Sequence, residues 1–346
     1  MKILIYGEYS GYGKSLATGF KSLGHEASVF SPNGDGWKKI TSEFTLPSAT
    51  NFGKLMDLIK LIPKFVQFEV VLITNPQFFN FKLLGPIILW LFKLKKLKLY
   101  LLCCGDDVEY IRAGESKKIK KFIFNGVEYP KNNYFKRLED KFINYICANA
   151  ALKIIPTMYD YQLPWSTSEF SGKLTEVIPL ACDAKPVSEI KKINMESIKI
   201  MLGINRADVK GSSYILAALE QIEKEFENVV IYTPEKLPQN RYLELLSQVD
   251  ISIDQCKCHS YGMNAIYAML NGHIVMAPAD EYHNKSFCIN SSPIISIDAN
   301  SDNIYLKIKN LICNYDLDGI KKDTLEYAKY FHSPLNVCKK ILAHIE

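Results

Sequence analysis

The sequence predicts an α/β protein made of two doubly wound parallel-sheet domains. Short apolar runs, such as KILIYG (2–7) and FEVVLITN (68–75), alternate with longer segments of helical period. These runs are continuously apolar, which is typical of strands covered on both faces, as in a parallel sheet. The alternation starts again after residue 197, and a chain of 346 residues is long enough for two domains of ordinary size.

The first predicted domain covers residues 1–183. Its predicted strands are KILIYG, EASVFS, FEVVLITN, KLYLLCCGDDV and ALKIIPT. Helical period appears over 13–25, where Gly24 closes the helix, and then over 51–66, 87–98 and around 132–150. The segment LTEVIPLACD closes the domain.

The second predicted domain covers residues 184–330 and begins with a linker. Residues 183–197 are polar, contain Pro186 and show no apolar period. The expected strands are IKIMLGI, NVVIYT, VDISIDQ, HIVMAP and SPIISID, and the helices between them include SSYILAALEQIEKEF, NRYLELLSQ and GMNAIYAMLNG. We expect residues 331–346, after a break at Ser333–Pro334, to form a helix that returns to the first domain.

Composition and cysteine spacing restrict the class of protein. None of the nine cysteines forms a CxxC pair, so neither a zinc site nor a disulfide framework is indicated, and Cys256-Lys257-Cys258-His259 lacks a paired ligand set. Met1-Lys2 leads directly into a strand, so no signal peptide is expected. The net charge of +5 is modest for a nucleic-acid-binding protein. We therefore expect a reduced cytoplasmic protein with no metal, no cofactor and no nucleic-acid partner.

The basic helix predicted over 87–98 leaves two interpretations open. It carries four lysines between apolar stretches, and its apolar part is too short to span a bilayer, which takes about 20 residues. It either rests on an anionic membrane surface, at the inner face of the plasma membrane, or is a core helix with a solvated lysine edge.

The glycine-rich segment GEYSGYGKSL (7–16) is similar to a Walker A loop but has the wrong spacing. Five residues separate Gly7 from Gly13, and Glu8 stands where the first glycine should be. A dinucleotide fingerprint is also incomplete, because Leu16 replaces the third glycine. What remains is a strand, a glycine turn at Gly11, Tyr12 and Gly13, and a helix N-terminus that favours an anion; a purely structural turn is the alternative.

A second candidate anion site lies in the second domain. GINRADVKG (203–211) puts Arg206 and Lys210 after a strand, with Gly211 opening a helix. Two cations and free helix N–H groups form a site for a diphosphate. Further on, VDISIDQ ends at Asp254-Gln255 and is followed by HSYGMNAIYAMLNGHIVMAP (259–278).

These segments resemble the GT-B glycosyltransferases of the large retaining family, family 4-like, that builds bacterial surface polysaccharides. The match rests on Lys210-Gly211, Tyr261-Gly262, Ala268-Met269, Gly272 and Val275, and VIPLACD resembles the family's linker motif. The resemblance covers nearly the whole chain and implies two Rossmann-like domains facing a central cleft. It also implies a UDP- or GDP-linked sugar donor, a lipid-linked or oligosaccharide acceptor of O-antigen or capsule type, and metal-independent transfer with retention of configuration.

The resemblance also implies roles for individual residues. Arg206, Lys210 and Gly211 would hold the donor diphosphate, and the turn at 11–13 would approach the phosphate or the acceptor. The sugar and ribose would contact Asp254, Gln255, Tyr261, Gly262, Met263, Asn264 and Tyr267. The catalytic candidates are His259, Asp106 and Asp107; one of the aspartates would orient the acceptor hydroxyl or accept its proton, while a helix N-cap is the alternative for either.

Two positions depart from the family pattern. The family's two glutamates, with seven residues between them, fall on His259 and Tyr267. A phenol is uncharged at neutral pH and accepts hydrogen bonds from ribose more weakly than a carboxylate does. A catalytically impaired nucleotide-binding partner subunit is therefore the alternative to a transferase, and a nucleotide-sugar epimerase of similar fold ranks third.

Overall fold

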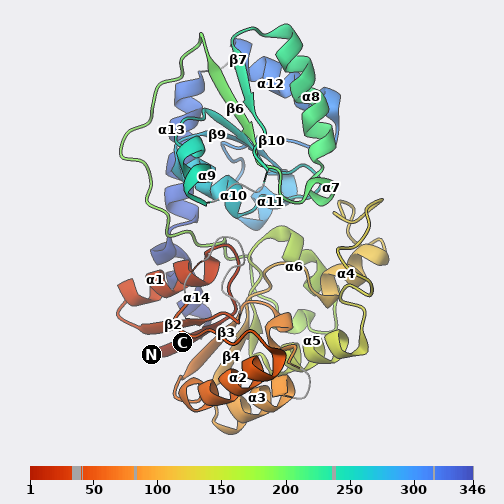
Figure 1. Cartoon of the computed structure of the whole chain (residues 1–346), viewed down its shortest axis with the longest axis vertical. Helices are drawn as coiled ribbons and strands as arrows, with labels where there is room; N and C mark the ends of the chain where they lie inside the picture. The colour runs from red at the N-terminus through yellow and green to blue at the C-terminus, as the bar shows by residue number, and fades with distance from the viewer. Residues whose placement is uncertain (33–39, 41, 82–83, 236–238, 315, 346) are drawn as a thin grey trace. The chain divides into compact units, whose positions relative to one another are not determined.

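The computed structural model describes residues 1–32, 40, 42–81, 84–235, 239–314 and 316–345. The chain divides into two compact units. Unit 1 contains residues 1–120, 129–183 and 333–346, and unit 2 contains residues 121–128 and 184–332. Each unit holds one five-stranded sheet with helices packed on it (Figure 1). All pairings between the named strands are parallel, so the predicted fold class is confirmed.

The sheet of unit 1 has the strand order β2-β1-β3-β4-β5. Its strands are β1 (Lys2–Tyr6), β2 (Glu26–Phe30), β3 (Val70–Ile73), β4 (Lys98–Leu101) and β5 (Lys153–Ile154). All four residues of the central strand β3 are buried, because helices cover both of its faces.

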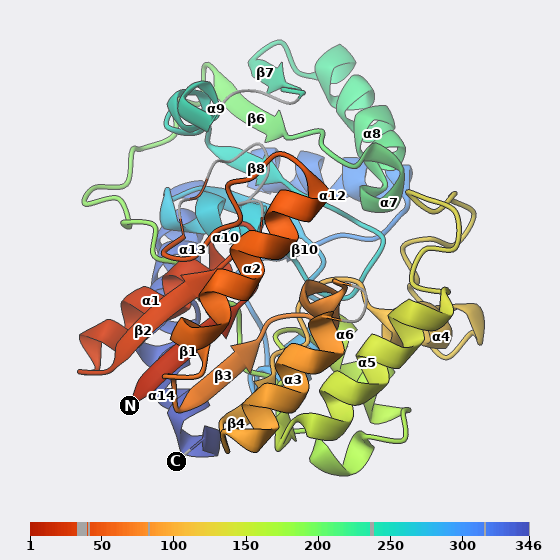
Figure 2. The ribbon, with the colours of Figure 1, turned by 60° about the horizontal axis from the view of Figure 1, so that its bottom comes forward.

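Three helices, α2 (Asn51–Phe65), α3 (Leu84–Leu94) and α5 (Leu138–Ala150), pack on one face of this sheet (Figure 2). They share a core with Leu4, Val71 and Leu99, which are aligned across β1, β3 and β4. The ring of Tyr6 stacks on Phe79 in the same core, with 4.1 Å between centroids. Unit 1 also contains η2 (Pro76–Phe79), α4 (Val108–Glu115), α6 (Tyr159–Ser166) and η3 (Ser171–Lys173).

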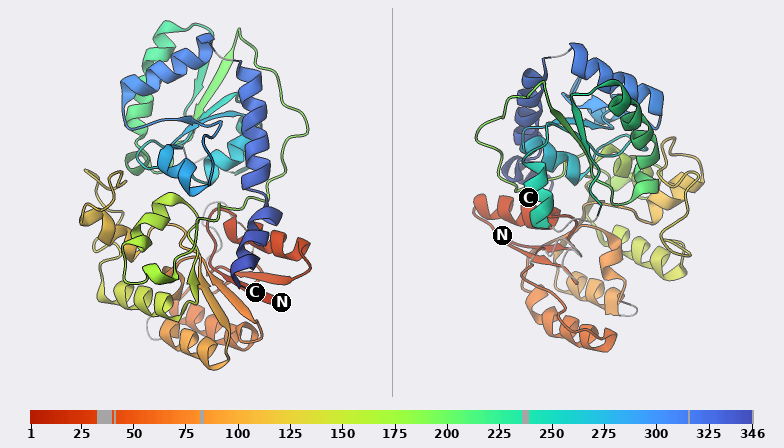
Figure 3. Two further views of the ribbon diagram at one scale, coloured as in Figure 1. Left: turned by 180° about the vertical axis from the view of Figure 1, so that it is seen from behind. Right: turned by 45° about the horizontal axis from the view of Figure 1, so that its top comes forward.

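The last helix of the chain, α14 (Pro334–Ile345), belongs to unit 1 and packs against α1 (Tyr12–Ser22). Figure 3 shows it in dark blue beside the red α1. A Cβ atom at Gly19 would lie 2.4 Å from the carbonyl oxygen of Pro334, so only glycine allows the two helices to approach this closely. The hydroxyl of Tyr100 donates to the carbonyl of Ile345. Tyr100 follows Leu99 on β4 and points to the other face of the sheet, so this bond links α14 to the face that α2, α3 and α5 do not cover.

Two sequence-based boundaries of unit 1 were wrong. The basic helix predicted over 87–98 ends at Leu94, because Lys96 adopts a left-handed conformation (φ 58°) and Lys98 begins β4. The helix predicted from residue 132 begins at Leu138. The LTEVIPLACD segment, which was expected to close the first domain, forms an isolated bridge from Leu174 to Ile154 and ends at Asp183, the last residue of this part of unit 1.

The sheet of unit 2 has the strand order β10-β9-β8-β6-β7. The strands are β6 (Ile198–Leu202), β7 (Val229–Tyr232), β8 (Ile251–Ile253), β9 (Ile274–Ala277) and β10 (Ile295–Ser296). The helices are α7 (Ala207–Lys210), α8 (Ser212–Glu225), α9 (Gln239–Leu246), α10 (Met263–Leu270), α11 (Glu281–Ser286), α12 (Ser301–Asn314) and α13 (Leu317–Phe331). Residues 121–128, which the sequence analysis placed in the first domain, pack with unit 2.

No helix within the described ranges has both the length and the apolar character needed to cross a membrane.

Candidate functional site

Charged side chains of unit 2 gather where its strands end. Lys210 follows β6, Asp254 and His259 follow β8, Asp280 follows β9, and Asp298 follows β10. The strands are parallel, so their carboxyl ends meet at one edge of the sheet, which is the usual ligand-binding edge of an open α/β sheet. We call this group the carboxyl-edge cluster.

Lys210 and Asp254 form a buried ion pair in this cluster. The Lys210 Nζ lies 2.5 Å from the Asp254 Oδ1, and the two side chains are 13% and 6% exposed. The other carboxylate oxygen of Asp254 faces α10, 3.9 Å from the position that a Cβ at Gly262 would occupy. The lysine predicted to hold a diphosphate therefore already has a carboxylate partner, and an incoming anion would compete with that carboxylate.

The N-terminus of α8 adjoins this pair. Gly211 precedes it in a left-handed conformation (φ 74°), and a Cβ there would lie 2.5 Å from the Sγ of Cys256. Gly211 provides no side-chain cap for α8, and the buried hydroxyl of Ser212 has no hydrogen-bond partner among the described residues. Arg206 is exposed one short helix upstream, at the start of α7. Amide groups, an unpaired hydroxyl and two cations thus lie close together in the chain, and Ser212 was missed by the sequence analysis.

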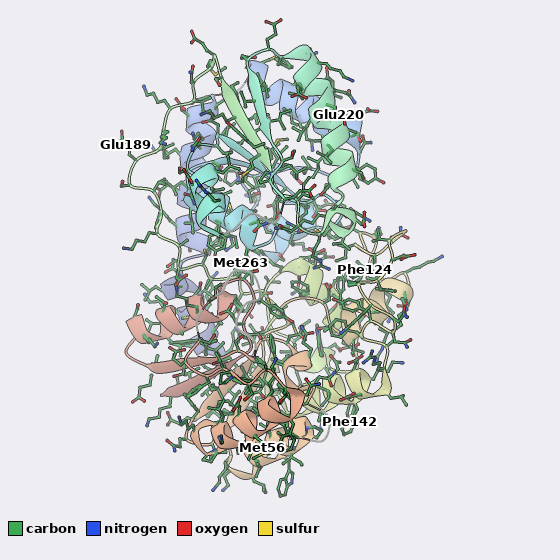
Figure 4. The ribbon with its side chains drawn as sticks, viewed as in Figure 1. Met56, Phe124, Phe142, Glu189, Glu220 and Met263 are labelled. Atoms are coloured by element: carbon green, nitrogen blue, oxygen red, sulfur yellow. The ribbon has the colours of Figure 1, made fainter. Side chains whose placement is uncertain are left out.

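The loop between β8 and α10 is held by Gln255. Its side-chain amide donates to the carbonyl of Ser260 at 2.9 Å and to the Sγ of Cys258 at 3.0 Å. The loop ends at Gly262, and α10 follows without a side-chain cap. Met263, labelled in Figure 4, is buried in the first turn of α10, and Asn264 beside it is half-buried. Gln255 therefore fixes the backbone of the segment in which the sugar contacts were predicted.

His259 belongs to a network of hydrogen bonds and ion pairs with Asp280, Lys121 and Asp298. Its Nδ1 lies 2.7 Å from the Oδ2 of Asp280, and the Lys121 Nζ contacts both Asp280 (3.0 Å) and Asp298 (2.5 Å). Burial acts to raise the pKa of Asp280, but hydrogen bonds from His259 and Lys121 outweigh it and lower that pKa to about 2. Asp280 is therefore ionised at neutral pH and orients the imidazole. The sequence offered no signal for this, since Lys121 is 159 residues away from Asp280.

Two predicted sugar contacts pack against other side chains of unit 2. Tyr261 is 2% exposed, and its hydroxyl bonds to the hydroxyl of Tyr327 at 3.1 Å and to the Nε2 of His332 at 2.9 Å. Tyr267 packs at the edge of a small apolar cluster that includes Met201.

In unit 1 the glycine turn surrounds a carboxylate of the protein itself. The side chain of Glu8 is buried and accepts hydrogen bonds from the backbone N–H groups of Gly11 and Lys14, both at 2.8 Å. Gly11 is left-handed (φ 90°), and a Cβ at Gly13 would lie 2.9 Å from the Glu8 Oε2. The two glycines therefore make room for Glu8, which supplies the negative charge that the N-terminus of α1 favours. Tyr12, between them, is buried. The expected approach of a phosphate to this turn stays a prediction.

Asp106 and Asp107 follow β4 in unit 1. Asp107 is the N-cap of α4: one of its oxygens accepts from the backbone N–H of Tyr110, and the other accepts from the indole of Trp165, both at 2.8 Å. Burial raises the pKa of Asp107 to about 7. Asp106 accepts a hydrogen bond from the hydroxyl of Tyr134 at 2.8 Å. The capping alternative thus describes Asp107, which also lines a small pocket with Asn75 and Asn144.

In the part of the chain that the structure describes, no three His, Cys, Asp or Glu side chains are grouped in a way that could hold a metal ion.

Comparisons with known proteins find similarity in structure only. No family model matches the sequence, and the search of curated proteins finds no match. The structure is similar to Anabaena HepE in complex with UDP and glucose, with 13% identity and a TM-score of 0.64 over 99% of each chain. It is also similar to WaaG, a glycosyltransferase involved in lipopolysaccharide biosynthesis (12% identity, TM-score 0.55, 100% of this chain and 99% of that one). A third similar structure is the UDP-GlcNAc 2-epimerase from Neisseria meningitidis bound to UDP-GlcNAc (13% identity, TM-score 0.51, 99% of each chain).

The chain has the GT-B fold. At these identities the likeness shows the fold alone, and both transferases and epimerases share it.

Proposed function

We propose that this protein is a glycosyltransferase that moves a sugar from a UDP- or GDP-linked donor to a lipid-linked or oligosaccharide acceptor. The proposal includes retention of configuration, independence of metal ions, and a role in bacterial surface polysaccharide synthesis at the cytoplasmic face of the membrane. The observation that carries it is the arrangement at the N-terminus of α8. There Arg206, Lys210 and amide groups without a side-chain cap lie close in the chain to the buried hydroxyl of Ser212, which no described residue pairs with.

In this proposal Arg206, Lys210 and the N-terminus of α8 stabilise the leaving group. As the bond between the sugar C1 and the phosphate oxygen breaks, its electron pair moves onto the nucleoside diphosphate. Arg206, Lys210 and the N–H groups of α8 are fixed positive groups that act where this charge develops. Lys210 then exchanges part of its contact with Asp254 for a contact with phosphate. Asp254 holds the lysine in place before the donor arrives.

The acceptor hydroxyl attacks the sugar C1, and its proton passes to a base. Asp106 suits this role better than Asp107, because both carboxylate oxygens of Asp107 are occupied in capping α4 and in holding Trp165. His259, oriented by Asp280, would contact a sugar hydroxyl or the diphosphate.

A second candidate function is nucleotide binding without transfer. It is favoured by Tyr267, whose ring packs in an apolar cluster at the position where a ribose-binding glutamate was expected. An epimerase is the third candidate, because one similar structure is a UDP-GlcNAc 2-epimerase.

The first experiment measures thermal stabilisation by UDP and GDP. A nucleotide that binds only the folded state raises the Tm with the logarithm of its concentration. We expect one of them to do so for the wild type and neither to do so for Arg206→Ala/Lys210→Met. Arg241→Ala is the matched control, since Arg241 is an exposed cation of unit 2 paired with Glu244. Equal stabilisation of the double variant would rule out the proposed diphosphate site.

The second experiment separates the three functions. The purified protein is incubated with UDP- or GDP-sugars, with and without membrane lipid extracts, and the products are followed by NMR. Transfer gives a new glycosidic signal and free nucleoside diphosphate, whereas epimerisation changes the sugar without an acceptor. Binding with no product under any condition favours the non-catalytic function.

A further inference from the structure

The outer side of one helical layer of unit 1 is unusually apolar. Of the 17 large apolar side chains that are exposed among the described residues, nine lie on α2, α3 and α5. They are Phe52, Met56, Ile59, Ile87, Trp90, Leu94, Leu138, Phe142 and Tyr145. Phe52 is 73% exposed and Trp90 is 59% exposed, so burial inside unit 1 does not explain them.

These side chains are additional to the ones that form the core. The inner sides of the same helices already supply Leu58, Phe65, Ile88, Phe92, Ile143 and Cys147 to the sheet. Since the three helices pack on one sheet face, their outer sides form one surface, which we call the α2-α3-α5 surface (Figure 2). Figure 4 labels two of its members, Met56 on α2 and Phe142 on α5.

Basic residues accompany the apolar ones. Six exposed lysines lie on these helices or in the turn after α3: Lys60, Lys64, Lys93, Lys95, Lys96 and Lys141. Of the acids on the three helices, Asp57 is tied to the backbone N–H of Ser48, and Asp140 to the side-chain amide of Asn80. Among the described residues of these three helices, Glu139 is the one acid whose side chain is exposed. The α2-α3-α5 surface is therefore both apolar and positively charged.

We propose that the α2-α3-α5 surface docks on an anionic lipid bilayer. Aromatic and aliphatic side chains insert at the boundary between headgroups and acyl chains, and the lysines contact anionic headgroups. Charge distinguishes this occupant from a second copy of the chain, because two such surfaces facing each other would bring lysines against lysines. In α3, Ile88 and Phe92 are buried in the core whereas Trp90 and Leu94 are exposed, so this helix can serve the core and face a membrane at the same time.

The test uses the full chain in sedimentation with vesicles. One set contains phosphatidylcholine alone, and the other contains equal parts of phosphatidylcholine and phosphatidylglycerol. We expect binding to the anionic vesicles that weakens at high salt, because salt screens exposed charges. Binding to neither set, or equal salt-insensitive binding to both, would overturn the proposal.

Two variants separate the contributions of charge and apolar contact. Lys93→Ala/Lys95→Ala/Lys96→Ala is expected to lower the partition coefficient about 100-fold, as three basic residues near an anionic surface should. Phe52→Ser/Trp90→Ser is expected to lower it at least about tenfold. Leu306→Ser/Tyr330→Ser, at two exposed apolar positions of unit 2, is the control and should bind as the wild type does. An equal loss in the control, or no loss in either test variant, would contradict the proposal.

Two further measurements exclude folding and self-association as explanations. The variant proteins should keep the wild-type Tm, since the substituted side chains are exposed. Light scattering without lipid should give the same mass for the wild type and Phe52→Ser/Trp90→Ser; a dimer that this variant dissociates would assign the surface to a second copy instead. The proposal does not depend on sugar transfer, because Arg206→Ala/Lys210→Met should bind vesicles normally.

Discussion

The buried pair Lys210–Asp254 gives the sharpest prediction about the site. Lys210→Met removes the ammonium group but keeps most of the length of the side chain. The carboxylate of Asp254, 6% exposed, is then left without its cation. Leaving one buried charge uncompensated lowers the free energy of unfolding by about 3–5 kcal/mol.

This loss is measured by calorimetry as a fall in the Tm of unit 2. A unit of this size loses about 2–4 °C per kcal/mol, so we expect a decrease of roughly 10 °C. The double variant Lys210→Met/Asp254→Asn should recover most of the decrease, because a neutral amide is much cheaper to bury than a carboxylate. Lys309→Met is the control: it breaks the pair with Glu225, whose members are 40% and 37% exposed, and should change the Tm little.

The double variant decides the outcome. If Lys210→Met is no less stable than Lys210→Met/Asp254→Asn, then Asp254 does not carry an uncompensated buried charge, and the reasoning is refuted. The same proteins also report on function: Asp254→Asn alone leaves Lys210 without a competing carboxylate, so it should bind UDP or GDP at least as tightly as the wild type.

Three further predictions concern the loops. Glu8→Ala should lower the free energy of unfolding of unit 1 by about 1–3 kcal/mol in urea, because the buried N–H of Gly11 and the partly buried N–H of Lys14 lose their acceptor, with Glu8→Gln intermediate. Burial raises the pKa of Asp107 to about 7, so Asp107 binds its proton more tightly in the folded state than in the unfolded state. The free energy of unfolding that this proton contributes should therefore fall as the pH rises from about 4 to about 7 and stay level above that. Denaturation followed by Trp165 fluorescence should show this slope in the wild type and lose it in Asp107→Asn. Gly211→Ala should lower the Tm and abolish stabilisation by nucleotide, because the φ of residue 211 is 74° and the new Cβ would lie 2.5 Å from the Sγ of Cys256. Adding Cys256→Ala to this variant should restore part of the lost Tm.

The sequence predicted the order of the elements well, but not their ends. The runs KILIYG, FEVVLITN and IKIMLGI are strands because apolar residues in an unbroken run need cover on both sides. The C-terminal end of the basic helix was predicted too late in the sequence, because lysines are good helix formers. No local pattern reveals that the backbone of Lys96 adopts a left-handed conformation before β4.

The candidate site was found only in part. Glycine and lysine after β6 are a local signal, because a helix N-terminus with nearby cations attracts an anion wherever it lies in the fold. Ser212 was missed because nothing in the sequence reveals that its hydroxyl is buried and lacks a hydrogen-bond partner within the described ranges. Asp280 was missed because its role depends on His259 and Lys121, and Lys121 comes from residues that the sequence placed in the other domain.

The sequence by itself determined two α/β units, a glycine turn after β1 and a basic turn after β6, since period and turn chemistry act over a few residues. Only the tertiary structure decided which charges meet. Glu8 occupies the turn that was expected to attract a ligand, and Asp254, 44 residues from Lys210, takes the lysine expected to meet a phosphate. The physical reason is that a buried charge must find a partner, and the parallel sheet brings that partner from a distant strand end.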